Sequence, residues 1–186
     1  RFFNKDMPWL TPQANVLLSK MINKKHVGFE FGSGKSTIWL AKRLKSLVSV
    51  ETNKNWHSIV TKLLYKNKLE NVDLTYVDKK LDYFEKNYLK KLNSFQDDYF
   101  DFILIDAHLR DICTYSSINK LKSGGILVID NVNRYLPFDS ISPYSITKNQ
   151  LPISLLWENI NNNFLKDWKC FHTTNGVTDT AIYIKS

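Results

Sequence analysis

The stretch that decides the fold runs from Val27 to Thr37 and reads VGFEFGSGKST. Its first five residues are an apolar run with one glutamate, which predicts a buried strand. Gly32-Ser33-Gly34 then breaks the strand into a turn, and a helix is expected to begin at Ser36. Glycine lacks a Cβ atom, so the backbone of such a turn can approach a bound molecule, and the free amides of the next helix point the same way. The stretch therefore predicts a turn that cradles a ligand.

Three classes of ligand could use this turn. Gly34-Lys35-Ser36 supplies the end of a P-loop, but Phe29 stands where that motif needs its first glycine. A nicotinamide-type fingerprint would need a third glycine where the chain has Thr37. Glu30 would repel a phosphate and attract a cationic ligand. S-adenosylmethionine carries an ammonium and a sulfonium, and it is the third class.

Acidic residues also end the next two predicted strands. The run from Leu47 to Glu51 predicts a strand that lies beside the first one in a doubly wound sheet. A carboxylate at its carboxyl end reaches the ribose hydroxyls of a nucleoside over the glycine turn. Asp78 follows the predicted strand from Val72 to Val77 and is a further candidate, for the adenine amine.

The pattern E-F-G-S-G-x-S-T, followed by an acid at the next strand end, resembles the cofactor loop of the class I S-adenosylmethionine-dependent methyltransferases. The resemblance covers nearly the whole chain. It implies an α/β fold that is Rossmann-like and doubly wound, with a mostly parallel seven-stranded sheet and an antiparallel C-terminal hairpin strand. It also implies that S-adenosylmethionine is held by Glu30, Gly32, Ser33, Gly34, Ser36, Glu51, Asp78 and Asp106.

Two aromatic residues near this turn have competing interpretations. Trp56 begins an amphipathic helical stripe that continues to Leu64, and it could stack on an adenine. We assign it to the core, because aromatic residues on such a stripe usually pack there. Trp9 precedes a helix that Thr11-Pro12 is expected to start, and it could lie over the cofactor cleft. We assign it instead as a packed edge plug.

The bulk properties predict one domain over residues 1–186, because 186 residues with 43% hydrophobic content suffice for one sizeable core. Residues 1–25 are expected to hold an N-terminal helix, and residues 132–150 a loop on the substrate side. No run approaches the ~18 apolar residues of a membrane span, and a cytoplasmic protein is expected. The net charge of +8 comes from scattered lysines. A small-molecule substrate is therefore favoured, with nucleic acid as the alternative.

Two further predicted strands end in acids. The apolar runs Tyr99–Asp106 and Ile126–Asn131 finish in Asp106 and in Asp130-Asn131. Adjacent strands lie ~4.8 Å apart, so these residues could share one hard cation such as Mg²⁺. They are similar to the metal set of the catechol-type O-methyltransferases. In the alternative interpretation Asp106 orients the cofactor, and Asp130 and Asn131 cap the following loop.

Candidate catalytic residues follow the fourth predicted strand. His108 is a candidate general base, because imidazole titrates near neutral pH. Arg110 is a candidate clamp for an anionic substrate, and Asp106 would act beside them. His108 and Arg110 could instead be plain loop residues or partners of a helix start. There is no N-P-P-Y or D-P-P-Y motif here, which argues against amino methylation of bases.

The sequence thus predicts an S-adenosylmethionine-dependent methyltransferase that acts on an oxygen of a small or saccharide-like molecule. Two alternatives stay open. One is a P-loop-type nucleotide hydrolase that uses Lys35. The other is a non-catalytic methyltransferase-like domain that binds a partner.

Overall fold

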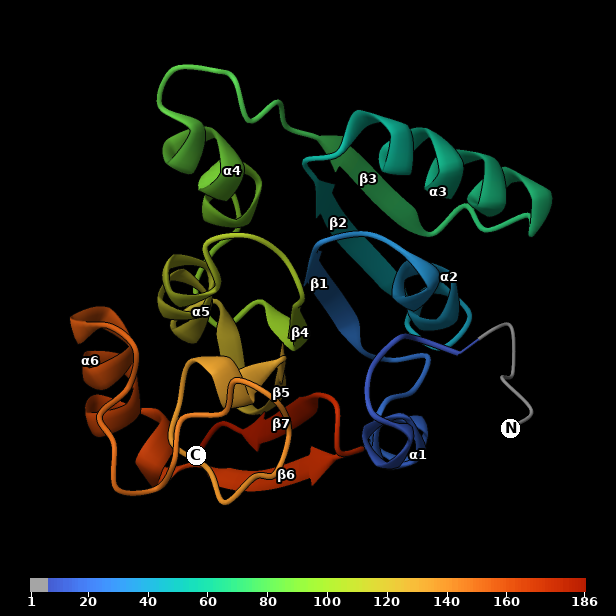
Figure 1. Cartoon of the computed structure of the whole chain (residues 1–186). Helices are drawn as coiled ribbons and strands as arrows, with labels where there is room; N and C mark the ends of the chain where they lie inside the picture. The colour runs from blue at the N-terminus through green and yellow to red at the C-terminus, as the bar shows by residue number, and fades with distance from the viewer. Residues whose placement is uncertain (1–6) are drawn as a thin grey trace.

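A computed structural model of the chain describes residues 7–186. Seven strands form one sheet in the order β3-β2-β1-β4-β5-β7-β6 (Figure 1). The strands are β1 (Val27–Phe31), β2 (Ser46–Glu51), β3 (Val72–Tyr76), β4 (Phe100–Ile105), β5 (Leu121–Asp130), β6 (Lys169–Thr174) and β7 (Asp179–Ile184). The first five run parallel, and β7 pairs antiparallel with both β5 and β6. The predicted doubly wound sheet with an antiparallel C-terminal hairpin is confirmed.

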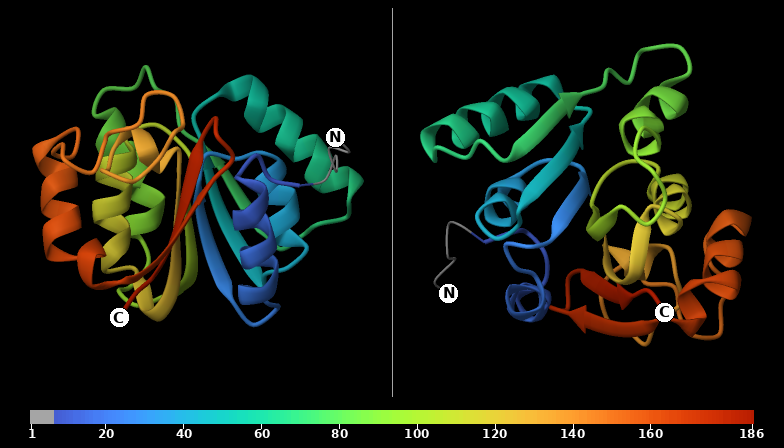
Figure 2. Two further views of the ribbon diagram at one scale, coloured as in Figure 1. Left: turned by 60° about the horizontal axis from the view of Figure 1, so that its bottom comes forward. Right: turned by 180° about the vertical axis from the view of Figure 1, so that it is seen from behind.

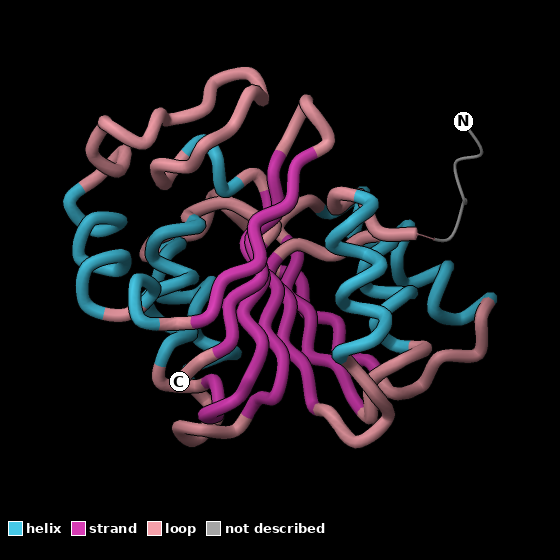
Figure 3. The backbone as a smooth tube through the Cα atoms, turned by 90° about the horizontal axis from the view of Figure 1, so that it is seen from below, coloured by secondary structure: helices cyan, strands magenta, loops and turns pink. Residues whose placement is uncertain are grey.

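Helices cover both faces of the sheet, which stands between them in Figure 3. One face carries α1 (Pro12–Met21), α2 (Lys35–Ala41) and α3 (Lys54–Lys66), and the other carries α4 (Phe84–Asn93), α5 (Arg110–Ile118) and α6 (Leu155–Asn163). Two short 3₁₀ turns follow β5 and α6, at Val132–Arg134 and Leu165–Asp167. Over residues 7–186 none of these helices has both the length and the apolar character needed to cross a bilayer.

The apolar strands feed two separate cores because successive side chains point to opposite faces of a strand. In β4, Ile103 and Ile105 pack against the side of α4, α5 and α6. Phe102 and Leu104, from the same strand, pack against the side of α1 and α2. A strand buried on both faces reads as a continuous apolar run, which is why β4 was recognisable in the sequence.

Local backbone geometry and a side-chain cap mark where two of the helices begin. Helix α4 begins at Phe84, directly after Tyr83, which adopts a left-handed conformation with φ of 58°. Helix α6 begins at Leu155. Ser154 caps it, since its hydroxyl accepts a hydrogen bond from the Trp157 backbone N–H at 3.2 Å.

The segment of residues 132–150 lies against the C-terminal hairpin (Figure 2). The Ser142 hydroxyl donates to the Oδ1 atom of the fully buried Asp179, at 2.6 Å. Phe138 stacks on His172, with ring centroids 4.2 Å apart and planes 7° from parallel. His172 Nε2 also lies 2.8 Å from Asp179 Oδ2. The segment is therefore anchored at two points on β6 and β7.

Candidate active site

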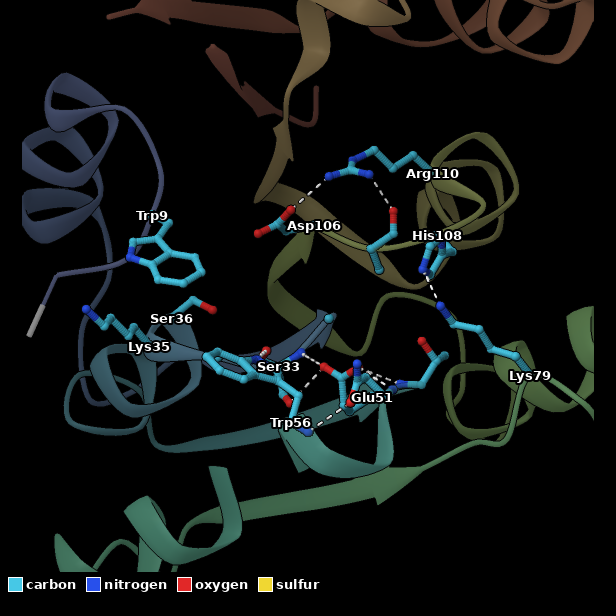
Figure 4. Close-up of a pocket in the computed structure, with 15 residues that line it drawn as sticks. Trp9, Ser33, Lys35, Ser36, Glu51, Trp56, Lys79, Asp106, His108 and Arg110 are labelled. Atoms are coloured by element: carbon cyan, nitrogen blue, oxygen red, sulfur yellow. Dashed lines mark hydrogen bonds and ion pairs between the residues drawn. The ribbon is translucent and has the colours of Figure 1, made fainter. Parts of the chain in front are cut away.

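A cavity of about 360 Å³ opens at the carboxyl ends of β1, β2 and β4 (Figure 4). This volume falls in the range of about 300–1,000 Å³ that is usual for ligand sites. The carboxyl edge of a doubly wound sheet, where the strand order reverses, is also the usual ligand position in such folds. The cavity is lined by Trp9, Gly32, Ser33, Gly34, Lys35, Ser36, Glu51, Thr52, Asn53, Trp56, Lys79, Asp106, Ala107, His108 and Arg110.

The glycine turn has the tight geometry that the sequence indicated. Gly32 has φ of +90°, and a Cβ atom there would collide with the backbone oxygen of Asp106. The Gly32 N–H donates to the Val50 carbonyl at 2.9 Å, which holds the turn against β2. Gly34 is less crowded, because the atom nearest to a Cβ built there is Trp56 Nε1, at 3.5 Å. Gly32 is therefore required for the close approach of the β1 and β4 ends.

Glu51, the last residue of β2, accepts four hydrogen bonds. Its Oε2 atom accepts from the Ser33 backbone N–H at 2.9 Å and from the Ser33 hydroxyl at 3.0 Å. Its Oε1 atom accepts from the backbone N–H groups of Thr52 and Asn53, each at 2.7 Å. The carboxylate thus joins the glycine turn to the approach to α3, and it forms part of the cavity wall.

Glu30 takes a different position from the one predicted for a cofactor ligand. It is fully buried in β1 and is not among the residues that line the cavity. Its Oε2 atom accepts from the hydroxyls of Thr37 at 2.6 Å and Ser49 at 2.7 Å. Its Oε1 atom has no hydrogen-bond partner among the described residues. Burial raises the pKa of Glu30 to about 7, because the charged form is poorly solvated there.

Asp78 also lies outside the lining of the cavity, and Lys79 takes its place there. The Asp78 carboxylate accepts from the Lys80 backbone N–H at 3.0 Å. The Lys79 ammonium points across the cavity mouth and contacts His108 Nε2 (Figure 4). Lys79 was not among the predicted site residues, and its one signal in the sequence is its position directly after a strand-end acid.

His108 lies in the cavity wall, as expected for the loop after β4. Its pKa is lowered by partial burial first, and then by the positive charges of Lys79 and Arg110. The imidazole is therefore neutral at pH 7. A neutral imidazole can accept a proton, which is what a general base requires.

Arg110, the first residue of α5, is held by the protein itself. Its Nη2 atom donates to Asp106 Oδ1 at 2.8 Å and to Asn131 Oδ1 at 2.9 Å. Its Nε atom donates to the Asp130 carbonyl at 3.1 Å, and its Nη1 atom to the Ala107 carbonyl at 2.5 Å. The predicted role as a free clamp for an anionic substrate does not fit, because most of its donors are already used.

The predicted Mg²⁺ ligands lie near one another but do not form an open oxygen cage. Asp130 is turned toward β7, where its Oδ1 atom accepts from the Thr180 hydroxyl at 2.8 Å. The Asn131 amide donates to Thr178 Oγ1 at 2.5 Å while its oxygen faces Arg110. Within residues 7–186 no three His, Cys, Asp or Glu side chains are grouped closely enough to hold a metal ion. The arrangement does not fit the predicted divalent cation.

Burial and neighbouring negative charges raise the pKa values of the two strand-end acids. The pKa of Asp106 is raised by burial, although the Arg110 guanidinium opposes this. Burial raises the pKa of Asp130 to about 7, with the nearby Asp106 as the next contribution. The site therefore holds less negative charge at neutral pH than two free aspartates would.

Trp56 lies in the cavity wall, so its assignment to the core was wrong. Its indole N–H donates to the Ser33 carbonyl at 2.5 Å. Its ring stacks on Trp9, with centroids 6.1 Å apart, and the Lys35 ammonium lies 5.4 Å from the centre of the Trp9 ring. Trp56 is in the first turn of α3, and its stripe reaches the core only at Val60.

A second cavity of about 290 Å³ adjoins the first. It lies between the start of α5 and the start of α6, and its walls include Tyr135, Ile153 and Trp157. Ala107, His108 and Arg110 line both cavities. The loop after β4 therefore separates two adjacent spaces, each large enough for a small molecule or part of one.

Residues 29–132 match the model of a family described as a methyltransferase domain. The chain belongs to this methyltransferase family. The match includes the glycine turn, Glu51 and the loop after β4, which are the segments that form the larger cavity. No curated protein matches the chain in sequence at a significant level.

Solved methyltransferase structures share the fold at low sequence identity. An O-methyltransferase of tomaymycin synthesis from Streptomyces achromogenes, solved with S-adenosylmethionine, is 18% identical, with a TM-score of 0.66 over 98% of this chain and 83% of its own. An rRNA methylase from Streptococcus thermophilus is 12% identical, with a TM-score of 0.61 over 93% and 94% of the two chains. A tRNA methyltransferase from Aquifex aeolicus is 13% identical, with a TM-score of 0.58 over 92% and 66%. Because these three proteins differ in substrate, the shared fold does not fix the acceptor.

Proposed function

We propose that this protein binds S-adenosylmethionine in the larger cavity and transfers its methyl group to an oxygen of a small or saccharide-like molecule in the adjoining one. Membership of the methyltransferase family supports the reaction type. The observation that carries the proposal is the pair of cavities that share the loop after β4. A donor and an acceptor held on either side of one loop can be brought into line for a displacement.

The residues of the larger cavity fit this cofactor. Gly32 leaves no room for a side chain between the ends of β1 and β4. Glu51 and Asp106 place carboxylates in the wall, which suits a ligand with an ammonium and a sulfonium. Ribose hydroxyls would donate hydrogen bonds to the Glu51 carboxylate, which already accepts one from the Ser33 hydroxyl. The Ser33 hydroxyl can make room because it rotates freely about its short side chain.

When bound, the cofactor supplies a methyl carbon on a positively charged sulfur. That chemistry would be an alkylation of the acceptor oxygen with the sulfur as leaving group, and the residues of the two cavities would hold donor and acceptor for it. The hydroxyl proton of the acceptor has to go to a base. His108 is neutral and lines both cavities, so we assign it this role. The exposed Lys79 ammonium contacts His108 Nε2, so it has to move aside before this nitrogen can take the proton.

The two alternatives predict different ligands. A nucleotide hydrolase would use Lys35 on phosphates, but the Lys35 side chain lies over Trp9, and the family assignment favours methyl transfer. A non-catalytic domain would keep the fold without cofactor affinity. Calorimetry distinguishes these cases, because only the methyltransferase proposal requires S-adenosylhomocysteine to bind.

The experiment titrates S-adenosylhomocysteine into the wild-type protein and into Glu51→Ala and Lys35→Ala variants. Hydrogen bonds to a charged group contribute about 1.5–3 kcal/mol, so Glu51→Ala should weaken binding by roughly 10- to 150-fold. Lys35→Ala should change it little. Absence of binding to folded wild-type protein at millimolar ligand would overturn the proposal. Binding of Mg-ATP that Lys35→Ala abolishes would favour the hydrolase.

A further inference from the structure

One half-buried acid, Asp106, one buried acid, Asp130, and an amide meet at the carboxyl ends of β4 and β5, where the sequence suggested a shared divalent cation. We propose that the Arg110 guanidinium permanently occupies this cation position. Asp106, Asp130 and Asn131 then form a site that is complete without a metal and closed to one. This inference concerns the chain alone, and it does not depend on the proposed function.

The hydrogen bonds of Arg110 show how completely the position is filled. A guanidinium has five N–H donors, and four of them have partners here, through Nε, Nη1 and both hydrogens of Nη2. The two Nη2 partners are side-chain oxygens of Asp106 and Asn131, and the other two are backbone carbonyls. The Arg110 side chain is 15% exposed. Its charge is fixed in place by acceptors from both strand ends.

A divalent ion would compete for the same oxygen atoms. Mg²⁺ and Ca²⁺ bind oxygens at about 2.0–2.6 Å. An ion bound to both Asp106 Oδ1 and Asn131 Oδ1 would have to share these two oxygens with Nη2, which is 2.8 and 2.9 Å from them. Its charge would also lie close to the like charge of the guanidinium, and both effects oppose its binding. The metal could enter only if Arg110 left, and four hydrogen bonds would then be lost.

The backbone around the site aims these side chains at one another. Leu109, just before Arg110, has a left-handed conformation with φ of 54°. Asn131, just after β5, has one with φ of 55°. Non-glycine residues adopt this region infrequently, and Asn does so more readily than most. The Tyr135 ring lies 5.7 Å from the guanidinium carbon and supports it further.

If the proposed function holds, Arg110 can also stabilise negative charge on the acceptor oxygen. Arg110 lines both cavities and keeps one N–H of Nη1 without an intramolecular acceptor among the described residues. This N–H can donate to an acceptor oxygen as the hydroxyl proton leaves. The guanidinium would then stabilise the developing negative charge, as a metal ion does in metal-assisted transfer.

The test measures Mn²⁺ binding to chelator-treated protein. Binding is monitored through the electron spin resonance signal of free Mn²⁺ and through thermal unfolding. Wild-type protein should show no saturable binding up to millimolar Mn²⁺. Arg110→Ala removes the guanidinium and leaves the oxygen atoms around a gap. It should bind Mn²⁺ at least tenfold more tightly than wild type, and its Tm should rise by a few degrees with the ion. Arg110→Lys keeps a positive charge and should not gain binding.

Saturable Mn²⁺ binding by wild-type protein that Asp106→Asn abolishes would overturn the proposal. A folded Arg110→Ala variant that gains no Mn²⁺ affinity would also contradict it, because the gap would not then be a cation position. If Arg110→Ala does not fold, the wild-type titration and Arg110→Lys still decide the question. Neither measurement uses S-adenosylmethionine, so failure here is distinguishable from failure of the proposed function.

Discussion

The buried carboxyl of Glu30 predicts an unusual dependence of stability on pH. Glu30 is fully buried in β1, and burial raises its pKa from 4.5 to about 7. As pH rises from 4.5 to 7, the unfolded chain releases this proton while the folded protein still holds it. The free energy of unfolding therefore falls through this range and stays lower above pH 7. Replacing Glu30 with glutamine should remove this loss.

The magnitude follows from the size of the shift. A rise from 4.5 to about 7, at about 1.4 kcal/mol per pKa unit, corresponds to about 3 kcal/mol. For a chain of this size 1 kcal/mol changes Tm by roughly 2–4 °C, so the expected change is roughly 6–12 °C. Glutamine suits the site because its carbonyl oxygen can accept from Thr37 and Ser49 as Oε2 does.

The assay is thermal unfolding of wild-type and Glu30→Gln protein at pH 5 and pH 8. The two proteins should have similar Tm values at pH 5, and the variant should unfold at the higher temperature at pH 8. Glu85→Gln removes an exposed carboxylate from α4 and serves as the control. Its Tm should differ from that of wild type by nearly the same amount at pH 5 and at pH 8. If the Tm difference between Glu30→Gln and wild-type protein is the same at pH 5 and pH 8, the reasoning is refuted.

Four other predictions follow from the site. Gly32→Ala should destabilise the protein by at least about 2 kcal/mol in urea unfolding, because φ is +90° and the Cβ would meet a backbone oxygen; Gly34→Ala should cost less. Lys79→Ala should raise the pKa of His108 in an NMR titration, because Lys79 is one of the two charges that lower it, and an unchanged pKa would exclude their contact in solution. Trp56→Ala should weaken S-adenosylhomocysteine binding by roughly two- to twelvefold in calorimetry, the loss of affinity expected when one aromatic contact is removed. Methyl transfer, once an acceptor is found, should be unchanged by EDTA.

The sequence predicted the fold and the strand ends because both depend on local patterns. The apolar runs of β1 and β4 and the glycines of the turn identify their elements without reference to distant residues. Glu51 and Asp106 line the cavity as expected, since Glu51 ends β2 and Asp106 directly follows β4, both at the carboxyl edge of the sheet. Glu30 was misplaced because it lies one residue before the end of β1, where its side chain turns into the interior.

The remaining errors concern contacts between segments far apart in the chain. The sequence shows Arg110 four residues after Asp106, but it does not show that Asn131 supplies a second acceptor to the same guanidinium. The metal prediction therefore left out the Arg110 guanidinium, which supplies the positive charge at this position. Trp56 was misassigned for a related reason. Its helical stripe was read correctly, yet only the packing of α3 against the glycine turn shows that the first residue of the stripe lies in the cavity.

The most direct test of the account is the structure of a crystal grown with S-adenosylhomocysteine. The account predicts electron density for the ligand in the larger cavity, with the ribose beside Glu51 and the amino acid portion over Gly32 to Gly34. His108 and Arg110 should then lie between the ligand sulfur and the smaller cavity. Density at another surface, or a cavity that holds only solvent at saturating ligand, would contradict the central claim.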